Sequence, residues 1–138
     1  MIKQIEDAII QRVKSEIAGL AVESFPLEGE YRLRHPLGAI LVRYLGSKYD
    51  SDHFEIGGNA AQALDEIPEN RSLQFELRLF LRNLKSHQAA HEKIQQILNA
   101  LTGFIPAPAQ ELLPLQDGLL KEQDGVWQFY IQFKTSYP

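Results

Sequence analysis

The stretch Gly38 to Leu45, with the sequence Gly-Ala-Ile-Leu-Val-Arg-Tyr-Leu, is the segment that decides the fold. It is entered through His35-Pro36 and left through Gly46-Ser47, and only Arg43 interrupts a run that is apolar in both registers. A strand that is apolar on both sides is typical of a sheet whose two faces are covered. We therefore expect this strand to lie near the centre of the sheet.

The segment Leu73 to Arg82 has the clearest period-2 pattern in the chain, because leucine and phenylalanine alternate with polar or charged residues. Its apolar side is expected to face the core. The opposite side is charged and broken only by Phe80, so it is expected to meet solvent or another subunit.

Four other segments are predicted to be strands or extended chain. Leu119-Leu120 and Val126 to Phe133 flank Asp124-Gly125, a dipeptide typical of a tight hairpin turn. In the second of these, Trp127 is expected to be buried together with the alternate apolar residues that follow it. Ala21 to Phe25 is a short strand candidate that would pair near Gly38 to Leu45, and Tyr31 to His35 is expected to be extended and at an edge because Pro36 follows it.

Two amphipathic helices are predicted. Apolar residues recur at steps of three and four from Ile2 to Ala18, and Gly19 ends this pattern. Ser86 can cap a second helix that stops at Gly103. The sequence thus predicts an α+β fold, in which two helices pack on a mixed, largely antiparallel sheet of about four to five strands. Residues 1–138 are expected to form a single domain.

The segment Gly46 to Arg71 has no periodicity and is too long for an ordinary connection inside a compact domain. Its apolar residues are too many for a solvated linker, so we interpret it as a loop that becomes ordered on a partner. Within this loop the expected partner-binding residues are Tyr49, His53, Phe54 and Ile56.

Composition excludes several classes of protein. The chain has no cysteine, so a disulfide framework and a thiolate metal site are both excluded. No apolar run is long enough to span a bilayer, and the N-terminus begins a charged helix, so we expect a soluble protein that does not bind membranes. The net charge is -4 and basic residues do not cluster, which argues against sequence-specific binding of nucleic acid.

A search for catalytic or metal-binding residues gives weak candidates only. His87 and His91 stand four apart on the second helix, but no third ligand is suggested near them. His35 and His53 have no serine or aspartate partner at a recognisable spacing, and Gly57-Gly58-Asn59 is a turn and not a phosphate-binding loop. The expectation from the residues is a protein that is not an enzyme, with no cofactor and no metal. Scattered carboxylates in the loop are interpreted as solvating, namely Asp50, Asp52, Glu55, Asp65, Glu66 and Glu69.

Four segments, taken in order, resemble the Mu-like bacteriophage tail terminator family over nearly the whole chain. They are His35 to Tyr44 with Gly46-Ser47, Arg82-Asn83-Leu84, Leu101 to Phe104, and Glu122 to Trp127. The resemblance implies a structural protein that forms a ring, a hexamer by the family's habit, on the end of the tail tube of a phage or a phage-derived contractile particle. Such a ring stops growth of the tube and provides the surface that joins the head or a cap.

The same resemblance implies the partners and the location. The partners would be further copies of this chain, the tail tube protein and a sheath or head-completion protein. The protein would reside in the bacterial cytoplasm during assembly and then in the tail of the finished particle. Two alternatives stay open from the residues: a small metal-dependent or acid-base enzyme that uses His87, His91 and loop carboxylates, and a monomeric adaptor that binds one partner through Gly46 to Arg71.

Overall fold

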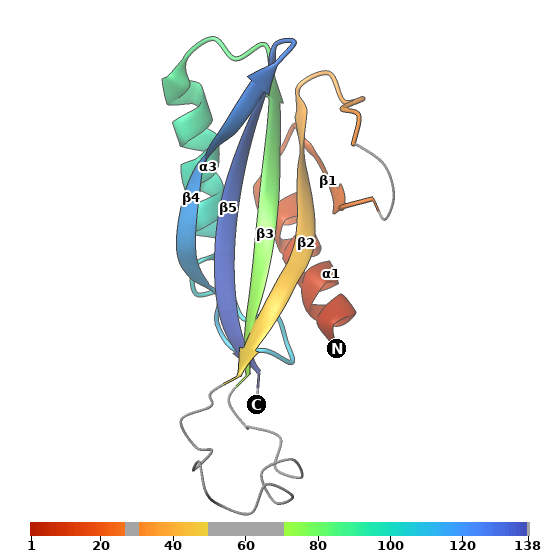
Figure 1. Cartoon of the computed structure of the whole chain (residues 1–138), viewed down its shortest axis with the longest axis vertical. Helices are drawn as coiled ribbons and strands as arrows, with labels where there is room; N and C mark the ends of the chain where they lie inside the picture. The colour runs from red at the N-terminus through yellow and green to blue at the C-terminus, as the bar shows by residue number, and fades with distance from the viewer. Residues whose placement is uncertain (27–30, 50–70, 138) are drawn as a thin grey trace, which may run out of the picture.

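Two helices cover one face of a five-stranded mixed sheet in a computed structural model that describes residues 1–26, 31–49 and 71–137 (Figure 1). The strand order is β1-β2-β3-β5-β4, in which β1 is parallel to β2 and the other pairs are antiparallel. This arrangement confirms the predicted α+β fold. The elements are α1 (Ile2–Glu16), β1 (Ala21–Ser24), β2 (Gly38–Tyr49), β3 (Arg71–Arg82), α3 (His87–Leu101), β4 (Leu113–Gln123) and β5 (Val126–Tyr137).

Strand β3 is the middle strand of the sheet, and β2, which contains Gly38 to Leu45, lies directly beside it and is paired on both edges, so the expected place near the centre is confirmed. Strand β3 pairs with β2 on one side and with β5 along its whole length on the other. The segment Ala39 to Val42 is fully buried on both faces, as its composition predicts, but Leu45 is exposed.

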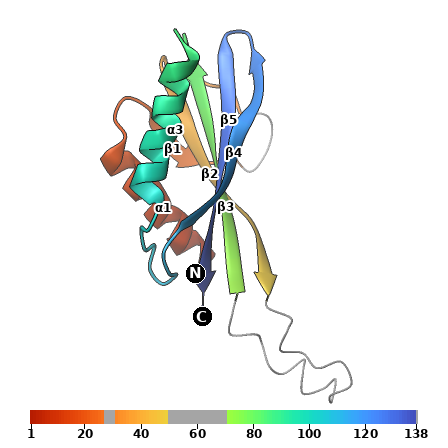
Figure 2. The ribbon, with the colours of Figure 1, turned by 90° about the vertical axis from the view of Figure 1, so that its left-hand side faces the viewer.

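The hydrophobic core lies between the helices and the sheet, and Figure 2 shows α1 and α3 side by side on the same face. Helix α1 contributes an apolar stripe, and the Oγ atom of Ser86 caps α3 by accepting a hydrogen bond from the backbone N–H of Ala89 at 3.2 Å. The sheet contributes every second residue of β3 and β5. The largest fully buried side chains are Phe75, Phe133, Ile5, Ile9, Ile40, Leu41, Leu73, Leu77, Leu79, Ile97, Leu101 and Leu112.

The C-terminal hairpin turns at the predicted dipeptide. Asp124 and Gly125 both have positive φ, 53° and 79°, which is the conformation that a two-residue turn of this kind requires. Strand β4, however, begins at Leu113, well before the residues that the sequence indicates. Trp127 is only partly buried and packs against the edge of the core, so its expected place inside the core is only partly correct.

The strands on either side of the predicted long loop are longer than expected. Strand β2 continues to Tyr49 through an irregularity between Tyr44 and Gly46, and β3 already starts at Arg71. The boundary of the loop at 46–71 was therefore wrong at both ends. Residues 50–70 lie outside the described residues.

No helix among the described residues is long and apolar enough to cross a membrane.

Candidate functional site

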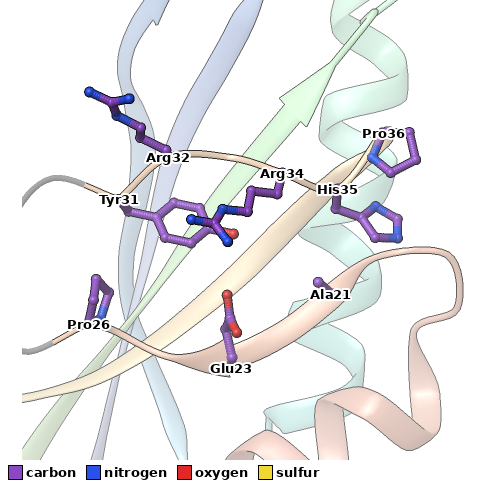
Figure 3. Close-up of a pocket in the computed structure, with 8 residues that line it drawn as sticks. All are labelled: Ala21, Glu23, Pro26, Tyr31, Arg32, Arg34, His35 and Pro36. Atoms are coloured by element: carbon purple, nitrogen blue, oxygen red, sulfur yellow. The ribbon is translucent and has the colours of Figure 1, made fainter.

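An open cleft of about 660 Å³ lies beside β1, between that strand and the segment that leads into β2. Figure 3 shows the side chains that line it. They come from β1, from Pro26 and from the stretch 31–36, and they are Ala21, Glu23, Pro26, Tyr31, Arg32, Arg34, His35 and Pro36. The stretch Tyr31 to His35, expected to be extended at an edge, forms no strand and instead covers part of the sheet face opposite the helices.

Tyr31 anchors this covering segment. Its ring packs on that of Phe80 with the centroids 5.0 Å apart, which places an aromatic pair on the outer face of β3. Burial and the neighbouring Glu23 carboxylate raise the pKa of Tyr31, whereas the charge of Arg34 lowers it. At neutral pH the phenol is therefore protonated and can donate a hydrogen bond.

The charged side chains of the cleft point in different directions. In Figure 3 the guanidinium of Arg34 lies beside the ring of Tyr31, and Arg32 points away from the cleft. The Nδ1 atom of His35 accepts hydrogen bonds from the backbone N–H groups of Leu37 and Gly38, at 3.3 and 3.4 Å. Nδ1 of His35 is thus engaged with the backbone at the entry to β2 and is not free to act as a general base. The cleft therefore offers polar groups that can bind another surface, and not a base for catalysis.

A second polar cluster lies on the same outer face and surrounds Glu76, which is only 4% exposed. Its Oε2 atom accepts hydrogen bonds from Arg43 Nε at 2.8 Å and from Arg78 Nη2 at 3.2 Å, and Gln132 Nε2 approaches Oε1 at 3.4 Å. The ring of Phe25 covers both guanidinium groups, 4.6 Å from Arg43 and 5.4 Å from Arg78. These contacts satisfy a buried carboxylate, and they form a structural network that joins β2, β3 and β5.

This network corrects the expectation for the charged side of β3. That side does not simply meet solvent, since Glu76 and Phe80 are both buried. Arg43, which interrupts the apolar pattern of β2, is the partner of Glu76 at 2.6 Å. The sequence contains both charged residues, but it does not show that Arg43 and Glu76 face each other, because this depends on the register of β2 against β3.

Of the predicted partner-binding residues, the structure places Tyr49 alone. Tyr49 is the last residue of β2 and 50% exposed, and the guanidinium of Arg71 on β3 lies 5.5 Å from its ring centroid. It belongs to a strand end and not to the predicted loop. His53, Phe54 and Ile56 lie outside the described residues, as do the carboxylates from Asp50 to Glu69.

The histidines that were weighed as metal ligands do not assemble a site in the described part of the chain. His87 and His91 are both exposed on α3, and His87 packs edge-on against Trp127 at 5.4 Å. Within residues 1–26, 31–49 and 71–137, no group of three potential ligands comes together.

Sequence reasoning found only the second half of strand β4, the outermost strand beside β5, and missed its first half from Leu113. All four of its leucines, Leu113, Leu115, Leu119 and Leu120, are between 42% and 54% exposed. Two irregularities in its pairing, at Pro114/Gln116 and Leu119/Lys121, break the alternation that would have revealed a strand. The signal that remained in the sequence was a leucine-rich stretch directly before a hairpin turn.

Comparison with known proteins places the chain in a family. The sequence profile of the Gp37 protein family matches residues 9–138. No curated protein matches the chain. The match extends from the first helix to the end of β5 and so includes the cleft, the Glu76 network and the exposed strand β4. The chain therefore belongs to the Gp37 protein family and is a bacteriophage-associated protein.

Proposed function

We propose that this protein is a tail terminator, a structural protein whose subunits form a ring on the end of the tail tube and stop its growth. The family match supports a phage structural or assembly protein, and the resemblance to Mu-like tail terminators supports the more specific role. The observation in the structure that carries the proposal is β4, an edge strand on which four exposed leucines gather.

The fold suits a subunit of a ring. A closed ring needs two different contact surfaces on every subunit. The long, paired strands β2, β3 and β5 hold such surfaces in fixed positions at the two ends of the sheet. A ring that covers the exposed end of the tube occupies the surface on which the next tube subunits would add. Growth therefore stops when the ring binds.

We assign the contact with the tube to the end of the sheet where β2 ends and β3 begins. Tyr49 and Arg71 lie side by side at this end, and the predicted partner-binding residues His53, Phe54 and Ile56 follow directly in the sequence. The protein acts in the bacterial cytoplasm during assembly and stays in the tail of the particle, where a sheath or head-completion protein binds the other side of the ring.

We further propose that the protein is not an enzyme and carries no cofactor or metal. Two candidate acid or base groups of the described sites are already engaged: Glu76 is paired with two arginines, and Nδ1 of His35 accepts hydrogen bonds from backbone N–H groups. Metal analysis of the purified full chain tests this proposal. Stoichiometric metal that is retained on purification and lost in His87→Ala or His91→Ala would contradict it.

Deletion of the gene is the direct test of the terminator role. Particles assembled without the protein are expected to have tails of irregular and excessive length that do not join heads or mature, and supplying the protein in trans is expected to restore them. Electron microscopy measures the tail lengths. Complete particles with tails of normal length in the deletion strain would rule the role out.

A further inference from the structure

A shallow apolar groove opens between the segment after α1, the start of β2 and the turn from β3 to α3. It has a volume of about 290 Å³, and four leucines, which we call the leucine floor, are among its lining residues: Leu20, Leu37, Leu81 and Leu84. Leu37 is 56% exposed, so the floor is accessible from solvent. Three basic residues, Arg82, Lys85 and Lys93, stand around it, and none of its described lining residues is acidic. The groove is thus an apolar depression within a positive rim.

Strand β4 has exposed leucines as well, but its charge is opposite to that of the groove rim. The irregularity at Leu119/Lys121 leaves Leu120 without a partner on β5, and Leu119 and Leu120 are 54% and 44% exposed. The stretch from Glu111 to Asp124 carries four acidic side chains against a single lysine, and all five are exposed. Strand β4 is therefore an apolar ridge flanked by negative charge.

We propose that β4 of one copy of this protein docks into the groove of the next copy, with Leu119 and Leu120 on the leucine floor and Asp117 facing Lys85. Apolar anchors in a pocket supply most of the energy of such contacts, and charges at the rim fix the choice of partner. The inference rests on the proposed ring and names its subunit interface.

The occupant is a second copy because both halves of the contact belong to the same chain. Within one copy β5 separates β4 from β3, whose end lines the groove, so the two surfaces belong to different parts of the molecule. A contact between two different surfaces of identical subunits is heterologous, and such contacts form a ring when the rotation from one subunit to the next closes and an open filament when it does not.

A symmetric contact of β4 with β4 is disfavoured by charge. Asp117 lies near the middle of the strand, so two antiparallel copies of β4 would bring their acidic residues together. Regular addition of a strand is disfavoured as well. Pro114 cannot donate a hydrogen bond to a neighbouring strand, and the two irregularities of β4 bend its edge away from a flat ladder. The contact is therefore made by side chains.

Charge exchange between the two surfaces tests this interface. Asp117→Lys on β4 and Lys85→Glu on the groove are each expected to raise the concentration at which the full-length protein assembles by about tenfold. An equimolar mixture of the two variants is expected to regain assembly, because alternating subunits restore an opposite-charge pair at every contact. Native mass spectrometry over a concentration series measures the oligomers, and Lys14→Glu on the exposed side of α1 is the matched control.

The apolar half of the contact has its own variant. Leu119→Ser is expected to reduce assembly at least as much as the charge changes, while Ile105→Ser, which removes an exposed apolar residue outside both surfaces, is expected to leave it unchanged. Circular dichroism confirms that each variant is folded before its assembly is compared.

The outcomes separate this inference from the terminator role. Three outcomes would overturn the interface, whatever the tail lengths in the deletion strain. The oligomers persist unchanged in the charge variants, the mixture fails to regain assembly, or the wild-type protein stays monomeric at every concentration. Conversely, assembly that follows the charge exchange in a protein whose deletion leaves tails normal would keep the interface and refute the terminator role.

Discussion

Strands β3 and β4 have nearly the same length and the same number of leucines, yet they differ in burial along their whole length. The four leucines of β3, Leu73, Leu77, Leu79 and Leu81, are at most 5% exposed, and those of β4 are all more than 40% exposed. Strand β3 alternates except at Phe80 and is paired on both edges, whereas β4 is irregular at two points and is paired with β5 only. Leucine content alone therefore does not decide burial. Position in the sheet and regularity of the alternation do.

The largest effect is expected when one leucine of each strand is truncated and the two results are compared. Leu77→Ala should lower the free energy of unfolding by about 3 to 4 kcal/mol, because the change leaves a cavity at a fully buried site. Leu119→Ala should lower it by no more than about 1 kcal/mol, because that residue is already 54% exposed. Chemical denaturation of the monomer measures both, and similar costs for the two variants would break the comparison.

The junction between β2 and β3 should be almost as sensitive. Gly38 has a φ of +150°, and a Cβ at this position would collide with the backbone carbonyl oxygen of Phe80 on β3. Gly38→Ala should therefore cost about 3 kcal/mol of stability. Gly46→Ala, in the same strand with nothing within 4 Å of the added Cβ, is the matched control and should cost little. A stable Gly38→Ala protein would show that β2 enters the sheet by a different path.

The outer face of β3 should show an intermediate effect. Glu76→Ala leaves two arginines without their buried partner, and breaking such a pair is strongly destabilising when it is fully buried. Because the side chain of Arg43 is 41% exposed and can be solvated, we expect a cost of about 2 kcal/mol. Glu92→Ala on the exposed side of α3 is the control. Thermal unfolding that is the same for both variants would show that the Glu76 network contributes nothing to stability.

The smallest effect is expected at alkaline pH. The pKa of Tyr31 is raised above its ordinary value of 10.0 by burial, with a contribution from Glu23. The folded protein therefore holds this proton more tightly than the unfolded chain does, so the contribution of Tyr31 is present below about pH 10 and is lost as the pH rises through the pKa of the folded state. Tyr31→Phe should remove that part of the decline. A decline of the same steepness in both proteins, measured by denaturation between neutral and alkaline pH, would place Tyr31 in solvent.

Much of the fold was predictable because local patterns and tertiary environment agree. The alternation in β3, the apolar stripe of α1, the cap at Ser86 and the turn at Asp124-Gly125 each follow from a rule that involves only neighbouring residues. The α+β class followed from these elements. The partner-binding residues His53, Phe54 and Ile56 stay a prediction, since they lie outside the described residues.

What the sequence by itself determined is thus a set of elements: two helices, the leucine-rich strand from Leu73 to Arg82 and the final hairpin turn. Only the tertiary structure decided that β3 and not β2 is the middle strand, and that Arg43 and Arg78 both pair with Glu76. It also decided that the leucines of β4 are exposed, in a chain that has an apolar groove with a positive rim. The physical reason is that periodicity reports which side of an element is apolar. Which strands become neighbours, and which apolar side then finds no cover, depends on contacts between residues that lie far apart in the sequence.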